Sequence, residues 1–138
     1  MKLLLSLVVV TLTLTAGLSQ SSSVTISSLK VMDIIDPSVH ELNSFFIDFS
    51  ASDAKSLSRI EISLEDNINR QMIIIPVSVK DKVAQLDFEK FSQPLSSNNI
   101  QFMQKVRNQF KEPYKRIVVK AYDQAGKETN QLVFERLK

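Results

Sequence analysis

The feature that most constrains the fold of this chain is a set of short segments in which apolar and polar residues alternate. Apolar side chains occupy every second position of residues 45–51 and again of residues 60–64. Because successive side chains of a β-strand point to opposite faces of its sheet, this period of two residues predicts half-buried strands. Five further segments rich in β-forming residues are expected to form strands: 24–32, 71–79, 83–88, 116–122 and 129–137. Turn-forming residues separate these segments, so the sequence predicts a mainly β, antiparallel sandwich of about seven strands.

Residues 98–111 show a different spacing. Phe102, Val106 and Phe110 recur at intervals of four, and the charged residues of the segment occupy other positions. Serine and asparagine residues before the segment suit a helix N-cap, and Pro113 cannot continue a helix. The spacing therefore predicts one amphipathic helix over about residues 98–111, inserted before the penultimate strand.

Residues 1–19 have the composition of a cleavable signal peptide. Lys2 precedes an apolar run over residues 3–16, and Gly17 and Ser19 suit a cleavage site before Gln20. The run is shorter than the roughly 20 residues that span a bilayer. An uncleaved membrane anchor is the alternative, but no charged stop-transfer flank follows. We expect residues 20–138 to form a single domain, secreted or periplasmic, that is soluble after cleavage.

The absence of cysteine excludes two classes of exported protein, the lipoprotein anchored through an N-terminal cysteine and the disulfide-stapled miniprotein. The domain must therefore depend on its own hydrophobic core. The 17 basic and 15 acidic residues nearly balance. Such a balance argues against a nucleic-acid partner and against binding to a membrane surface, because both need a concentrated positive field.

Two regions of the chain resemble bacterial immunoglobulin-like domains. Residues 121–126, Ala-Tyr-Asp-Gln-Ala-Gly, follow an alternating segment and look like the F strand and F–G turn of that family. Residues 49–53 and 57–62 are similar to its B strand, B–C loop and C strand. The resemblance covers residues 45–66 and 115–136. It implies an immunoglobulin-like sandwich, a fold that mostly serves adhesion and assembly.

The chain departs from that family in several places. It lacks the two cysteines that bridge the sheets and the tryptophan of the C strand, and Ile117 stands where a conserved tyrosine would lie. The predicted helix falls in the E–F connection, which is short in most such domains. These departures argue against an antibody-like or receptor-like role.

The residues needed for catalysis are scarce. A nucleophile is usually activated by a histidine, and the only histidine, His40, lies in a polar segment between the first two strands. Glu61 and Glu65 are paired carboxylates, but they are expected on the solvent face of a strand. With only two glycines, the chain also lacks a phosphate-binding loop. The sequence therefore predicts that this is not an enzyme.

Three aspartates are candidate metal ligands. If the sandwich topology holds, Asp53, Asp81 and Asp123 lie in loops at one end of the domain, and clustered carboxylates suit calcium. The alternative is that each aspartate caps its own turn, since lysines crowd the same loops. Carbohydrate binding has weaker support, because the chain has no tryptophan and only the tyrosines Tyr114 and Tyr122. No other cofactor is expected.

The segment Met72-Ile73-Ile74-Ile75-Pro76-Val77 is the most informative candidate surface. If its odd-numbered residues face the core, Ile74 points away from it. Pro76 lacks a backbone donor, so the strand is expected at a sheet edge, where an apolar strand invites pairing with another chain. The predicted helix could cover this edge, which is the arrangement we favour. Alternatively Pro76 alone protects it, or a second copy or another protein adds a strand.

The sequence leads to one functional hypothesis and one alternative. The first is an exported, non-catalytic binding or structural module that docks to a protein partner, with Ile74 and Pro76 as candidate contact residues. The alternative is a calcium- or carbohydrate-binding accessory module of the cell envelope.

Overall fold

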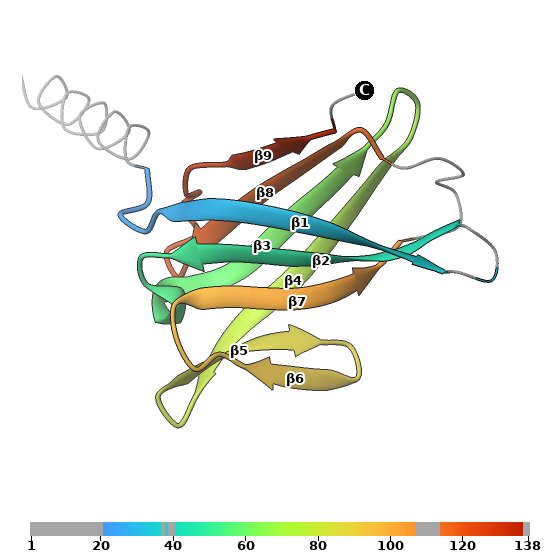
Figure 1. Cartoon of the computed structure of the whole chain (residues 1–138). Coiled ribbons are helices and arrows are strands. Elements are labelled where there is room, and N and C mark those ends of the chain that lie inside the picture. Colours follow the sequence, from blue (N-terminus) through green and yellow to red (C-terminus); the bar gives the residue numbers. More distant parts are fainter. Residues whose placement is uncertain (1–20, 37, 39–40, 107–113, 137–138) are drawn as a thin grey trace, which may run out of the picture.

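The computed structural model describes residues 21–36, 38, 41–106 and 114–136, so the predicted signal peptide lies outside the described residues. Two antiparallel sheets account for most of this part of the chain (Figure 1). The small sheet has the order β1-β2-β7, formed by Ile26–Asp36, Glu41–Ala51 and Asn99–Lys105. A short 3-10 turn, η1 (Ala54–Ser56), follows β2 and leads into the other sheet.

The large sheet has six strands in the order β6-β5-β4-β3-β8-β9. In chain order these strands are β3 (Leu57–Glu65), β4 (Arg70–Lys80), β5 (Val83–Phe88), β6 (Phe91–Pro94), β8 (Arg116–Asp123) and β9 (Leu132–Glu135). All neighbouring strands pair antiparallel. The prediction of a mainly β, antiparallel protein is confirmed.

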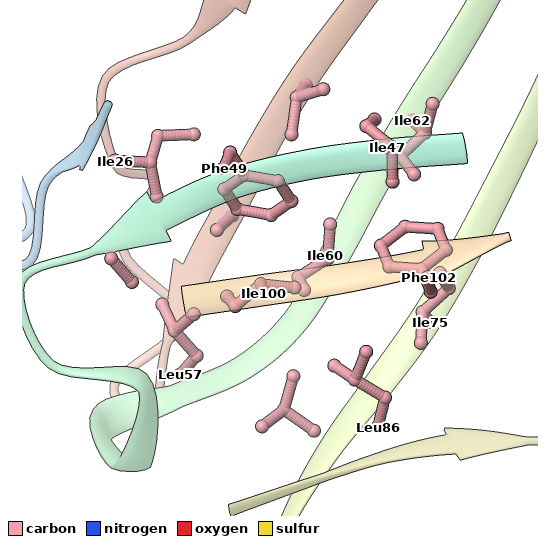
Figure 2. Packing of buried hydrophobic residues seen from close by; sticks show 14 of the residues in the cluster. Ile26, Ile47, Phe49, Leu57, Ile60, Ile62, Ile75, Leu86, Ile100 and Phe102 are labelled. Carbon is pink, nitrogen blue, oxygen red and sulfur yellow. The ribbon is translucent and has the colours of Figure 1, made fainter. Parts of the chain in front are cut away.

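The core lies between the two sheets, where inward-facing side chains of both meet. Phe49 of β2 and Ile100 of β7 lie in this layer with Ile60 of β3 and Leu86 of β5 (Figure 2), and all four are fully buried. The alternation read from residues 45–51 and 60–64 is confirmed, since the apolar residues at every second position of both segments are buried; Ser63, which is also buried, is the exception on the other face. With no cysteine in the chain, this apolar layer is the main source of stability.

The predicted helix over residues 98–111 is wrong for residues 99–105, which form β7; residues 107–111 lie outside the described part of the chain. An interval of four residues between apolar positions fits a helix, but it is also a multiple of two and therefore fits a strand. Ile100 and Phe102 are buried while Gln101 and Met103 are exposed, which is the strand period. Residues 99–105 form a strand and not a helix because they pair with β2.

A polar cluster ties the two sheets together at one end. The Tyr114 hydroxyl, just before β8, donates a 2.6 Å hydrogen bond to Asp33 Oδ1 on β1. Arg136, just after β9, forms an ion pair with the other carboxylate oxygen of Asp33, and its Nε donates to the Tyr114 carbonyl oxygen at 2.9 Å. The Arg136 guanidinium also lies 4.7 Å from the centroid of the Tyr114 ring. The Asp33–Tyr114–Arg136 cluster thus joins the small sheet to both C-terminal strands of the large sheet.

This cluster makes the protein sensitive to alkali. Burial, and then the Asp33 carboxylate, raise the pKa of Tyr114 well above its ordinary value. The folded state therefore favours the neutral phenol. The resulting stabilisation is complete below the unfolded-state pKa of about 10 and is lost as the pH rises above it.

Because the chain has only two tyrosines and no tryptophan, absorbance of tyrosinate can follow each one. We expect Tyr122 to ionise first and Tyr114 only as the protein unfolds. Tyr114→Phe should remove the late component and flatten the fall of melting temperature above about pH 10, whereas Tyr122→Phe should remove the early one. Full ionisation of both tyrosines in a protein that circular dichroism shows to be folded would contradict this expectation.

Candidate functional site

Strand β4 is paired over different residues on its two sides. Residues 70–76 pair with β3, from Glu65↔Arg70 to Arg59↔Pro76. On the opposite side β5 pairs only with residues 77–80. Figure 1 shows the β5–β6 hairpin beside one end of β4 only. Within the described residues, no strand pairs with the other side of residues 70–76, which we call the open edge.

Two hydrogen bonds show which residues direct their backbone groups to the open edge. Asn69 O accepts from Asp66 N at 3.1 Å, so the backbone groups of Asn69 face β3. Successive residues of a strand direct their N–H and C=O groups to alternate sides. Arg70, Met72 and Ile74 therefore face away from β3, toward the open edge, and so does the nitrogen of Pro76.

The turn between β4 and β5 leads to the same assignment. Leu95 N donates to Ala84 O at 2.8 Å, so the backbone of Ala84 faces β6 and that of its neighbour Val83 faces β4. Val83 pairs with Lys80. Lys80 and Pro76 are an even number of residues apart, so both face the β5 side.

Pro76 lies where the β4–β5 ladder ends. The last pair of that ladder is Val77↔Leu86. Proline has no N–H, so Pro76 cannot donate a further hydrogen bond to β5. The pairing of β4 with β3 loses no donor, because the backbone nitrogen of Pro76 faces away from β3. The expectation of a sheet edge therefore holds for one side of residues 70–76 only, because β4 lies between β5 and β3 in the strand order and residues 77–80 pair with β5.

Apart from Arg70, the side chains on the outer face beside the open edge are apolar and exposed. Ile74 is 57% exposed and Met72 is 41% exposed, both on the outer face of the large sheet. Ile75 is buried and Ile73 packs against the core on the inner face. Ile68, in the turn before β4, is 91% exposed. Ile68, Met72 and Ile74 are therefore exposed apolar residues along the open edge, and the exposed side chain of Arg70 lies between the first two.

A shallow groove of about 220 Å³ lies next to Met72 on the outer face of the large sheet. Its basic residues are already paired with carboxylates: Arg70 with Glu65 at 3.6 Å, Arg116 with Glu135 at 4.0 Å, and Lys120 with Glu128 at 3.3 Å. Glu61, which also lines the groove, pairs with Arg59 at 3.1 Å. These internal pairs leave the groove without an evident charge preference for a ligand.

The helix that we favoured as a cover for the open edge does not exist over residues 99–105. These residues belong to β7 of the small sheet, so they do not lie over β4 as a helix. Two of the expected arrangements remain. Either Pro76 alone limits pairing at this edge, or another chain adds a strand to it.

The candidate metal ligands Asp53 and Asp123 both accept hydrogen bonds from their own turns. Asp53 caps η1, accepting from Lys55 N at 3.2 Å and from Ser56 Oγ at 2.5 Å. Asp123 Oδ1 accepts from the backbone N–H groups of Ala125 and Lys127, both at 2.9 Å. The bond from Lys127, the largest of several contributions, lowers the pKa of Asp123.

The structure brings the turns of Asp53 and Asp123 together, because Gln124 N donates to Ser56 O at 2.9 Å. Asp81 lies in the β4–β5 turn, where it and Lys82 have positive φ values of 50° and 65°, as a two-residue hairpin turn requires. In the part of the chain that the structure describes, no three His, Cys, Asp or Glu side chains form a group that could hold a metal ion.

We expect the melting temperature to stay unchanged when EDTA or millimolar calcium is added. A ligand that binds only the folded state stabilises it, by about 2.7 kcal/mol when its concentration is a hundred times the dissociation constant. Differential scanning fluorimetry in calcium and in EDTA measures this directly. An increase of several degrees in calcium, reversed by EDTA, would establish a calcium site and contradict the turn-capping role of Asp53 and Asp123.

The remaining candidates are one histidine, two carboxylates and a tyrosine. His40 lies outside the described residues. Glu61 and Glu65, the two carboxylates considered for catalysis, lie on the outer face of β3 and form the ion pairs given above. Tyr122 lies beneath Arg59, whose guanidinium carbon is 3.7 Å from the ring centroid. No pattern in the sequence pointed to the Asp33–Tyr114–Arg136 cluster, because its members are far apart in the chain.

None of the helices in the described ranges has the length and apolar character needed to cross a bilayer. No protein-family description matches this chain, and neither a curated protein nor a solved structure shows significant similarity to it.

Proposed function

We propose that this protein is an exported, non-catalytic binding or structural module that docks to a protein partner through the open edge of β4. The observation that carries this proposal is the combination found at residues 70–76. Backbone N–H and C=O groups lack a strand partner there among the described residues, and Met72 and Ile74 lie exposed beside them. An extended segment of a second chain satisfies the backbone groups and covers the apolar side chains at the same time.

An immunoglobulin-like fold is part of the proposal, and the strand order supports it. In such domains strands A, B and E share one sheet, and strands G, F and C share the other, with C′ and C″ added beside C in the variable type. The order β1-β2-β7 corresponds to A-B-E, and β9-β8-β3-β4-β5 corresponds to G-F-C-C′-C″. Because a fold does not determine a function, the docking role rests on the open edge and not on this likeness.

Export is supported by the sequence of residues 1–19 alone, with its single positive charge, short apolar run and small residues before Gln20. An exported domain without a covalent anchor meets its partner in the extracellular or periplasmic space. N-terminal sequencing of the product from the medium and from a periplasmic fraction tests this part; an intact Met1 on a protein confined to the cytoplasm would overturn it.

Site-specific photo-crosslinking in cells that make the protein naturally tests docking. A photoreactive amino acid at position 74 should give a discrete crosslinked product that contains a second polypeptide. The same amino acid at position 133 is the matched control, because Val133 is 43% exposed on the same sheet but lies on β9, away from the open edge. No product at position 74, or equal products at both positions, would overturn the proposed docking site.

A further inference from the structure

We infer that the partner at the open edge is a second copy of this chain, paired β4 to β4 about a two-fold axis centred on Met72. This inference rests on the proposed docking function and names its occupant. A two-fold axis brings the same strand of each copy together in antiparallel orientation, and the interface is then self-complementary. Pairing through β4 would join the two large sheets into one continuous sheet.

The register follows from the residues that direct their backbone groups to the open edge. In an antiparallel pair, residues that exchange two hydrogen bonds must both face the partner. With Met72 opposite Met72 of the second copy, Arg70 lies opposite Ile74, and Ile74 lies opposite Arg70. Every N–H and C=O group that Arg70, Met72 and Ile74 direct to the edge then has a partner.

The ends of the open edge fit this register. Ile68 of one copy lies opposite Pro76 of the other, so the missing donor of Pro76 falls at the turn, where the ladder has already ended. The side chain of Ile68, 91% exposed in the single chain, gains an apolar neighbour there. Met72 and its counterpart also lie side by side on the outer face of the joined sheet.

Of the two neighbouring registers, the one that would bring more of β4 into the ladder collides with β5. If Met72 lay opposite Ile74, Asn69 of one copy would lie opposite Val77 of the other. That position is already occupied by Leu86, the last residue of β5 to pair with β4. Pro76 would also lie opposite Arg70, and because proline has no N–H, the carbonyl oxygen of Arg70 would have no donor. The Met72-centred register is therefore the longest ladder that the open edge accepts before β5 begins.

The test is the mass of the purified, naturally processed protein, measured by sedimentation equilibrium over a range of concentrations. We expect the mass of a dimer for the natural sequence. Met72→Lys and Met72→Glu should each give monomers, because the axis places like charges directly opposite each other. Mixing the two variants should restore a dimer, since Lys then faces Glu. Met103→Lys, at a residue 60% exposed on the small sheet, is the matched control and should remain a dimer.

Circular dichroism of each variant separates loss of pairing from loss of folding, and recovery in the mixture excludes unfolding as the cause. A natural protein that is monomeric at all concentrations overturns the dimer. If position 74 still crosslinks to a different protein, the docking function stands and only this inference fails. A dimer restored by mixing Met72→Lys with Ile74→Glu, but not by the two Met72 variants, overturns the register.

Discussion

Replacing Asp33 by alanine should lower the free energy of unfolding by about 3 kcal/mol, because it removes the acceptor shared by two buried or half-buried donors. Asp33 accepts from the Tyr114 hydroxyl at 2.6 Å and pairs with the Arg136 guanidinium. Tyr114 is fully buried, and the Arg136 side chain is only 28% exposed. Without the carboxylate, a hydroxyl and a positive charge remain poorly solvated at the junction of the sheets.

Two further variants separate the parts of this effect, all measured by urea denaturation. Tyr114→Phe removes one hydrogen bond but keeps the ring against Phe45, so we expect a loss of about 1 kcal/mol. The rings of Phe45 and Tyr114 lie edge to face, with centroids 5.9 Å apart. Asp48→Ala is the control: Asp48 lies on the outer face of β2 and accepts an exposed hydrogen bond from Gln101 at 3.1 Å, so its loss should change stability by less than about 0.5 kcal/mol. Equal effects of Asp33→Ala and Asp48→Ala would contradict a structural role for the cluster.

Replacing Phe49 by alanine should have the largest effect of any single change considered, a loss of about 4 kcal/mol. Phe49 is fully buried on the central strand of the small sheet and lies in the layer between the sheets (Figure 2). Its removal loses buried apolar area and leaves a cavity that rigid strands on both sides cannot fill. A domain of this size has about 5 to 15 kcal/mol of stability in total, so the variant should be marginally folded.

A graded series distinguishes packing from general disruption. Phe49→Leu nearly conserves volume and should cost about 1 kcal/mol, while Met103→Ala, at an exposed position, should cost less than about 0.5 kcal/mol. The midpoint and slope of urea unfolding supply both quantities. A loss below about 1.5 kcal/mol for Phe49→Ala would be inconsistent with a fully buried phenylalanine.

The strands that the sequence predicted well are those whose pattern is local. Apolar residues at every second position of residues 45–51 and 60–64 lead directly to β2 and β3, because the two faces of these strands meet different environments. Residues 83–88 and 116–122 also form strands within one residue of the expected bounds. The strand Phe91–Pro94 was missed, since four residues that include a proline carry no alternation.

The spacing of apolar residues over 98–111 led to a wrong prediction because it fits both the helical and the strand period. Phe102, Val106 and Phe110 fit both a helix and a strand, and the capping residues before them favoured the helix. Residues 99–105 form a strand because they pair with β2, which lies 55 residues earlier in the chain at the pair Ile47↔Phe102. No local signal in residues 98–111 contains that information.

The candidate sites also differ in whether they depend on residues that are near or far apart in the sequence. The capping of turns by Asp53 and Asp123 was among the expected alternatives, because a side chain that bonds its own turn needs only its neighbours in sequence. The Asp33–Tyr114–Arg136 cluster was not foreseen, because it joins residues that are 81 and 103 positions apart.

The sequence by itself determined that this chain forms an antiparallel β protein without disulfides. It also determined that one side of the strand containing Pro76 lacks a backbone N–H donor at that residue. These are properties of single residues and of short-range periodicity. Only the tertiary structure decided that β5 covers residues 77–80 and leaves residues 70–76 open, and that residues 99–105 complete the small sheet. Such outcomes depend on which distant strands pair and in which register, and pairing energy is shared between segments, so neither segment encodes it alone.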